Sequence, residues 1–319
     1  MCRSWKSSRK SSGKRRFRFI MMDGVSLWIA EPPDRLRLWP ALGIVLTSRR
    51  QDLHKLAMRA LYPGTSQLYM GHGRVLYCGP IQHLETHVYG ANVLHVGIYR
   101  PFRIRLADGE WRSCRCAVVP AGIRHALDMA GGVHGKLFVE RNGPDATGFR
   151  KRFPYSETTV RFFEDAETIE CFRWVHEEDP NRIAVEQRLD RLLNTRDQPP
   201  IELDERIRQV IERICREPDR NFSQEELAKL VDLSPSRFLH LFRQCTGLPY
   251  RRFRLWKRMV SALELLHASD TLTRAALDAG FADATHFSHS FRDTFGVNPA
   301  PVFRNIGRFE VSPEMVDKR

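Results

Sequence analysis

The sequence predicts two domains: an N-terminal, mainly-β barrel and a C-terminal, all-α domain with two helix-turn-helix units joined by a long helix. Three observations favour this fold class. Short apolar runs alternate with turn residues from about Ser66 to Glu140, one small helical unit occurs twice after residue 200, and a proline-containing segment separates these regions. A chain of 319 residues is also longer than one hydrophobic core usually organises.

The repeat is the most informative feature of the C-terminal region. Residues 236–247 read SRFLHLFRQCTG and residues 285–296 read THFSHSFRDTFG, so two phenylalanines, a histidine, an arginine and a final glycine recur in register. Each copy follows a shorter apolar helix, predicted over 226–231 and 271–279, after a tight turn. This is the helix-turn-helix plan. A chain that carries two such units in one domain is predicted to bind DNA with both.

Capping residues support helices at these positions. Ser223 and Glu226 form the pattern of a capping box, and Ser234 precedes a proline at the first helical position. In the second unit, Asp283 can cap its helix, and Gly280 stands where a left-handed residue would end the preceding one. The paired phenylalanines, four residues apart, bury one face of each helix and leave the opposite face polar.

The polar faces supply the candidate DNA contacts. A merely solvated face of an amphipathic helix is the alternative for a single copy, and the duplication disfavours it. The basic start of the joining helix adds side chains at a spacing that suits backbone phosphates. The candidate DNA-binding residues are Ser236, Arg237, His240, Arg243, Arg251, Arg254, Arg258, Thr285, His286, His289 and Arg292.

Within this set, Arg237 and His240 are predicted to contact bases, and Arg243 and Arg292 to contact phosphates. A joining helix over 249–267 is roughly 28 Å long at about 1.5 Å per residue. That length approaches the ~34 Å between successive major-groove faces on one side of the duplex. One chain is therefore expected to contact two adjacent groove segments.

The most specific motif of the chain is the run from Phe287 to Pro299, supported by Ala279-Gly280-Phe281 and by Gly247-x-Pro249-Tyr250. With these residues, the segment 201–306 resembles the DNA-binding domain of the AraC/XylS family of transcriptional regulators. His289 stands where family members usually carry arginine, so a weaker base contact is expected there. The resemblance implies a sequence-specific regulator that binds double-stranded DNA, with RNA polymerase as a further candidate partner and without catalytic residues or a cofactor.

The N-terminal half reads as a small barrel or jelly roll. Its predicted strands cover 68–70, 75–77, 93–99, 102–106, 117–119 and 136–140, with a hairpin turn at Asp108-Gly109. The stretch from Val118 to Leu127 resembles a strand pair of cupin domains, which implies a cupin-like sensor domain for an unknown small-molecule effector. No effector-binding residue is assigned.

The histidines of this half raise a metal alternative. The set is His83, His87, His95 and His125. The His-x-His pair of metal-bearing cupins is absent, so no metal site is predicted. The competing class of protein is nevertheless a metal-dependent cupin enzyme fused to a DNA-binding module. A third alternative is an architectural protein that binds DNA without regard to sequence.

Charge and cysteine content bound the remaining possibilities. The net charge is +13, and residues 1–19 hold eight basic side chains and no acidic one, so we expect a disordered basic tail. Alternatively, translation starts at Met21 or Met22. Seven scattered cysteines form no disulfide framework, and neither a membrane span nor a signal peptide is evident. The predicted localisation is cytoplasmic.

Two helices, over 166–176 and 181–194, are predicted between the halves. Val185, Leu189 and Leu192 form an apolar stripe that either packs on the barrel or makes a homodimer contact, and both alternatives stay open. Residues 197–200 then form the linker. The predicted organisation is a basic tail (1–20), a cupin-like sensor domain (21–165), interdomain helices and linker (166–200), an AraC-type DNA-binding domain (201–306) and a C-terminal tail (307–319).

Overall fold

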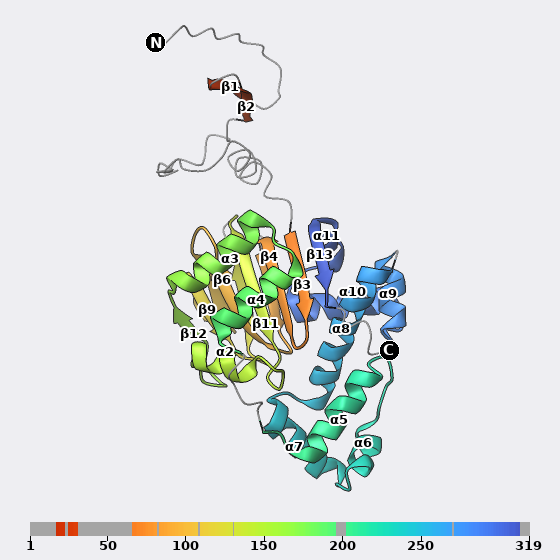
Figure 1. Cartoon of the computed structure of the whole chain (residues 1–319). Coiled ribbons are helices and arrows are strands. Elements are labelled where there is room, and N and C mark those ends of the chain that lie inside the picture. Colours follow the sequence, from red (N-terminus) through yellow and green to blue (C-terminus); the bar gives the residue numbers. More distant parts are fainter. Residues whose placement is uncertain are drawn as a thin grey trace. The chain divides into compact units, whose positions relative to one another are not determined.

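The computed structural model describes residues 17–22, 25–30, 66–81, 83–107, 109–129, 131–195, 202–269 and 271–312. The chain divides into two compact units, residues 1–49 and 50–319. In the first unit, β1 (Phe17–Met22) and β2 (Val25–Ala30) pair as an antiparallel hairpin. All other described elements belong to the second unit (Figure 1). No described helix is long and apolar enough to cross a membrane.

Two sheets form the β domain of the second unit and confirm the predicted mainly-β half. Their strand orders are β5-β10-β7-β8 and β12-β9-β6-β11-β4-β3-β13, and all neighbours are antiparallel except β13 and β3. The strands are β3 (Ser66–Gly71), β4 (Arg74–Pro80), β5 (His83–Val88), β6 (Asn92–Gly97), β7 (Phe102–Leu106), β8 (Arg112–Cys114), β9 (Cys116–Val119), β10 (Arg124–Asp128), β11 (Val133–Val139), β12 (Arg161–Phe163) and β13 (Ile306–Val311).

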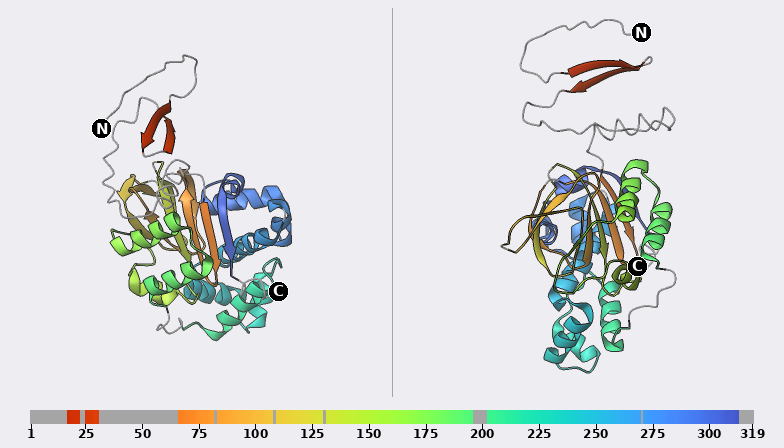
Figure 2. Two further views of the ribbon diagram at one scale, coloured as in Figure 1. Left: turned by 45° about the horizontal axis from the view of Figure 1, so that its top comes forward. Right: turned by 90° about the vertical axis from the view of Figure 1, so that its left-hand side faces the viewer.

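The seven-stranded sheet is buried on both faces. Leu137 and Val139 of β11 lie on the outer face of the sheet and pack against three helices. Phe138, between them, lies on the inner face, toward the other sheet. The covering helices are α2 (Ala146–Arg152), α3 (Ala166–Glu178) and α4 (Arg182–Leu193), and Figures 1 and 2 show α3 and α4 lying across this face. The apolar stripe of α4 is buried in the same cluster, at Val185, Leu189 and Leu192. The stripe therefore packs on its own barrel.

The C-terminal half is helical, and both predicted helix-turn-helix units are present. The first unit is α6 (Gln224–Leu230) with α7 (Pro235–Thr246), and the second is α9 (Leu272–Asp278) with α10 (Ala284–Phe295). The long helix α8 (Tyr250–Ala268) joins them; α5 (Glu205–Arg216) precedes the first unit and α11 (Pro299–Arg304) follows the second. The predicted linker at 197–200 lies outside the described residues.

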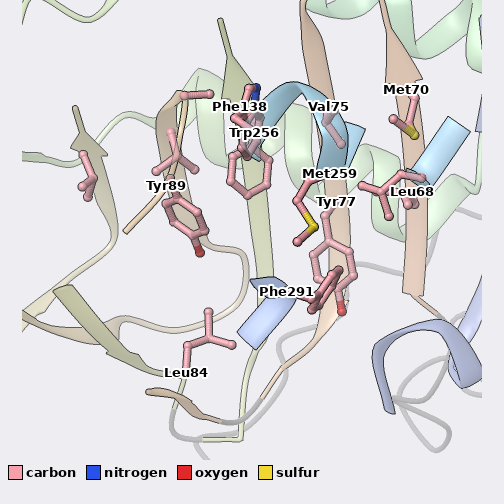
Figure 3. Packing of buried hydrophobic residues seen from close by; sticks show 14 of the residues in the cluster. Leu68, Met70, Val75, Tyr77, Leu84, Tyr89, Phe138, Trp256, Met259 and Phe291 are labelled. Carbon is pink, nitrogen blue, oxygen red and sulfur yellow. The ribbon is translucent and has the colours of Figure 1, made fainter. Parts of the chain in front are cut away.

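The second helix-turn-helix unit shares its hydrophobic core with the barrel. Phe138 of β11 packs against Trp256 of α8 and Phe295 of α10, with ring centroids 5.7 and 6.1 Å apart, and Figure 3 shows Phe138 beside Trp256. Phe287 and Phe291 of α10 belong to the same cluster. The first helix-turn-helix unit has a separate core, whose buried residues all lie between 207 and 253. The two units therefore differ in how much they depend on the barrel.

Polar contacts fix the same interface. Glu140, directly after β11, accepts hydrogen bonds from Lys257 Nζ at 2.6 Å and from Trp256 Nε1 at 3.2 Å. Burial alone raises the pKa of Glu140, but the Lys257 ammonium outweighs burial and holds this pKa below its usual value. At the end of α10, the backbone N–H of Glu85 donates to the carbonyl of Gly296 at 2.9 Å.

The last strand returns the chain from the helical domain to the barrel. β13 runs parallel to β3, from Ile306 beside Ser66 to Val311 beside Met70. Arg308 Nε lies 3.0 Å from Asp179 Oδ1 at the end of α3. The sequence assigns residues 307–319 to a C-terminal tail, and this assignment is wrong as far as residue 311. The sequence of a short strand does not reveal its partner when that partner, here β3, lies far away in the chain.

Gly247 and Gly296 end α7 and α10 in the same left-handed conformation, with φ of +74° at each. A Cβ at Gly296 would lie 2.6 Å from the carbonyl oxygen of Glu85, which is barrel backbone, whereas a Cβ at Gly247 would meet the movable side chain of Arg141. Both Gly→Ala changes cost about 1 kcal/mol for the backbone. We expect Gly296→Ala to destabilise the protein by at least about 1 kcal/mol more, because the clash separates α10 from β5.

Denaturant unfolding of both variants checks this prediction, and Gly247→Ala is the matched control. Hydrogen exchange should also show that Gly296→Ala speeds exchange in α10 and β5 while α6 and α7 stay protected. Equal destabilisation by the two changes would contradict close packing of Gly296 against the backbone of β5.

Candidate DNA-binding interface

The second helix of each helix-turn-helix unit, α7 or α10, begins at a side-chain cap. Ser234 Oγ accepts from the backbone N–H of Arg237 at 3.3 Å in the first unit, and Asp283 Oδ1 accepts from that of His286 at 2.7 Å in the second. The capping box of α6 is only half formed. Ser223 Oγ accepts from the N–H of Glu226 at 3.0 Å, but the Glu226 carboxylate pairs with an arginine in the preceding loop instead of returning to the cap. A nearby cation competes with a backbone amide for that carboxylate.

The first unit presents its predicted polar face to solvent. Phe238 and Phe242 of α7 are fully buried. Ser236, Arg237 and His240 are exposed on the other side of the helix, and Arg243 is exposed one turn further on. The amphipathic pattern alone therefore predicts which side of α7 faces outward.

The second unit shows the same division around a shallow hollow. The hollow is lined by Ala284, Thr285, Ser288, His289, Arg292 and Asn298. Thr285, His289 and Arg292 are exposed. His286 is engaged locally, since its Nδ1 accepts from the N–H of Ala282 at 3.4 Å and its ring packs on Phe281. His286 thus shapes the turn before α10. Sequence periodicity did not single out Ser288 or Asn298, which only the folded turn brings to this surface.

Of the three α8 arginines predicted to contact backbone phosphates, two donate hydrogen bonds within the fold instead. Arg251 is exposed. Arg258 is 9% exposed, and its guanidinium donates to the carbonyls of Pro218 at 3.4 Å and Asp219 at 3.1 Å. Arg254 is half-buried and donates to a carbonyl of the same loop at 3.0 Å. Carbonyl groups of the loop between α5 and α6 accept these hydrogen bonds. The spacing of the arginines along α8 does not predict contacts with that loop.

The candidate metal ligands are divided by the fold. His83 is exposed at a sheet edge, whereas His87, His95 and His125 are buried inside the barrel together with His134. Sequence reasoning did not single out His134, because a strand buried on both faces does not reveal which side faces inward. Among the described residues, no three histidine, cysteine, aspartate or glutamate side chains are grouped to hold a metal ion.

The C-terminal domain matches a helix-turn-helix domain family over residues 227–305, a range that starts in α6 and ends after α11. It is a helix-turn-helix domain of the AraC type, as the run from Phe287 to Pro299 predicts. A transcriptional activator, RhaS of Escherichia fergusonii, is 38% identical over 81 residues, which are 25% of this chain and 29% of RhaS.

The arabinose operon regulatory protein of Escherichia coli K12 is 34% identical over 104 residues, which are 32% of this chain and 35% of that protein. The chain therefore spans about a third of the length of these curated relatives. A crystal structure of an apo ToxT variant from Vibrio cholerae has a TM-score of 0.53 at 10% identity, over 75% of this chain and 99% of ToxT. This likeness covers both domains and concerns the fold alone.

Arg258 and Arg251 give a matched test of which arginines support the fold. Arg258→Ala removes a guanidinium that is only 9% exposed and that donates to two carbonyls of the loop before α6, so we expect the free energy of unfolding to fall by about 1–3 kcal/mol. Arg251→Ala should stay within about 0.5 kcal/mol of the parent protein but lower the salt slope of DNA binding by about one unit. Denaturant titrations and binding at several salt concentrations measure both. Unchanged stability of Arg258→Ala would contradict the structural role.

The buried histidines predict acid lability. Burial, and then the neighbouring His125, lower the pKa of His87 well below 6.5, and burial lowers the pKa of His125 to about 4. These rings are neutral in the folded state and take up protons in the unfolded chain below pH 6.5. Their contribution to stability is therefore complete above pH 6.5 and is lost as the pH falls; for His125 the loss is about 1.4 kcal/mol per pH unit and continues toward pH 4.

Urea unfolding at pH 7.5 and 5.5 measures this loss. His125→Gln should reduce the difference between the two pH values, whereas His240→Gln, at an exposed position, should leave it unchanged. Equal pH dependence in all three proteins would count against neutral buried imidazoles.

Proposed function

We propose that this protein is a sequence-specific, DNA-binding transcription regulator. The observation that carries the proposal is the pair of exposed polar faces on α7 and α10, each opposite a buried phenylalanine face, in a domain of the AraC type. The net charge of +13 favours a polyanionic partner. The partner is double-stranded DNA, because a recognition helix of this kind fits the major groove.

The contacts divide into base contacts and phosphate contacts. Arg237 and His240 contact bases from the first unit, and Thr285 and His289 do so from the second. Ser236, Arg243, Arg251 and Arg292 are assigned to the phosphate backbone. Histidine and threonine discriminate less than a bidentate arginine, so the first unit supplies more of the specificity.

The barrel is proposed to modulate DNA binding in response to a small molecule. Support comes from the shared core, through which a change inside the barrel reaches α10 directly. The proposal gives the barrel a sensory role and no catalytic one. RNA polymerase and a second copy of the chain are further candidate partners, and the cytoplasm is the expected location.

His240→Ala should weaken binding to the specific site by about 1–3 kcal/mol while leaving binding to random DNA nearly intact, because a base contact is lost. Arg243→Ala is the contrasting variant: it should weaken binding to all sequences alike and lower the salt slope by about one unit. The site itself comes from mapping genomic binding positions. Gel-shift titrations then compare specific and random duplexes. Equal losses on both duplexes for His240→Ala would overturn the base contact, and indifference of the parent protein to sequence would overturn the proposed function.

A further inference from the structure

The hollow on the second helix-turn-helix unit is lined by polar side chains that the fold itself does not use. Among the described residues, no hydrogen bond or ion pair engages the side chains of Ser288, Arg292 or Asn298. Arg274 of the same unit differs, because it is 73% exposed and still pairs with Asp278. Exposure alone therefore does not explain why the Arg292 guanidinium lacks a carboxylate.

Asn298 stands at the N-cap of α11 but does not cap this helix. The side chain of an N-cap residue ordinarily accepts from the backbone N–H of the second or third helical residue. The third residue of α11 is Pro301, which has no N–H, and no side-chain cap hydrogen bond is formed. The caps of α9 and α10, Thr271 and Asp283, do accept such bonds. The Asn298 amide is therefore available to a partner outside the chain.

The internal repeat shows that these polar groups are particular to the second unit. When α7 is aligned on α10, Ser288 corresponds to Leu239 and Asn298 corresponds to Pro249. Leu239 packs against the core of the first unit, and the side chain of Pro249 has no hydrogen-bonding group. Serine is also a weaker helix former than leucine. The stability of α10 therefore does not account for Ser288.

The three side chains come to the hollow from two directions. Ser288 and Arg292 are four residues apart on α10 and share one face of it, and the turn after α10 brings Asn298 to the same hollow. An arginine only donates hydrogen bonds, and a hydroxyl and a carboxamide donate as well. No carboxylate of the described residues lines the hollow. This set of donors fits an anion with several acceptor oxygens.

We propose that the hollow binds one phosphate of the DNA backbone, held by Arg292, Ser288 and Asn298. The assignment rests on the proposed function and adds two contacts to it, one of them from outside the helix-turn-helix. Base edges face the N-terminal residues of a recognition helix, whereas Arg292 and Asn298 lie in and beyond the C-terminal half of α10. The phosphate anchors the second unit whatever the base sequence, next to the weaker base contact of His289.

Methylphosphonate interference with the full-length protein, on the duplex mapped as its specific site, tests this assignment. Neutral methylphosphonate at the phosphate in the hollow should weaken binding by the parent protein about tenfold. Asn298→Asp puts a carboxylate in place of the donor, and it should weaken binding to specific and random duplexes alike, by about tenfold. At that same phosphate, methylphosphonate should then have little effect, because the contact is already lost.

Two further variants separate this contact from folding and from general charge. Ser288→Ala brings a better helix former, so its Tm should not fall, yet it should bind both duplexes about fivefold more weakly. Asn298→Asp should also keep its Tm, because aspartate and asparagine are equally good N-cap residues. Asn305→Asp is the matched control: it makes the same change of charge at an exposed position on the other end of α11. It should keep the interference pattern of the parent protein.

The remaining outcomes overturn the phosphate site. A loss for Asn298→Asp on the specific duplex alone would show that Asn298 contacts a base. Unchanged interference in Asn298→Asp would place the sensitive phosphate elsewhere, and equal weakening by Asn305→Asp would reduce the effect to general charge. Parent-like binding by Asn298→Asp and Ser288→Ala would remove the site and leave the proposed function intact. A parent protein that binds no duplex would overturn the proposed function, and the phosphate site with it.

Discussion

The packing of Phe138, Trp256 and Phe295 is the interaction on which the rest of the structure depends. A buried aromatic ring contributes on the order of 2 kcal/mol. Phe138 of the barrel and Trp256 of α8 are buried, and the half-buried Phe295 of α10 packs against both. This packing makes the barrel and the second helix-turn-helix unit one core. Glu140 and Lys257 then fix the direction of α8, and β13 ties the end of the domain to the barrel sheet. The second helix-turn-helix unit cannot move far from the barrel without exposing this core.

The first unit is built differently, and the difference bears on regulation. Its phenylalanines pack on Tyr250 and on helix α5, and its buried residues all lie between 207 and 253, with Ala121 of the barrel packed at the edge of this core. The barrel therefore shares more of its buried core with α10 than with α7. Coupling of this kind needs no signal carried over a long distance, because the sensor interior and the second unit share side chains such as Tyr89.

The polar interior of the barrel has a cost that an apolar core would not have. Four neutral imidazoles and one lysine occupy inward positions that valine or leucine could fill, and several of the imidazole nitrogen atoms have no hydrogen-bond partner among the described residues. Unpartnered buried polar atoms are destabilising, and natural proteins keep them mainly where a function requires them.

The sequence alone determined the mainly-β half, both helix-turn-helix units, the joining helix and the exposed faces of α7 and α10. These features follow from local rules: period-two and period-3.6 patterns, capping by Ser234 and Asp283, and left-handed glycines at Gly247 and Gly296. Only the tertiary structure decided that Arg258 serves the loop before α6, that Lys136 and His134 face inward, and that residues 306–311 complete the barrel sheet. These outcomes depend on contacts between segments far apart in the chain, which no local pattern encodes.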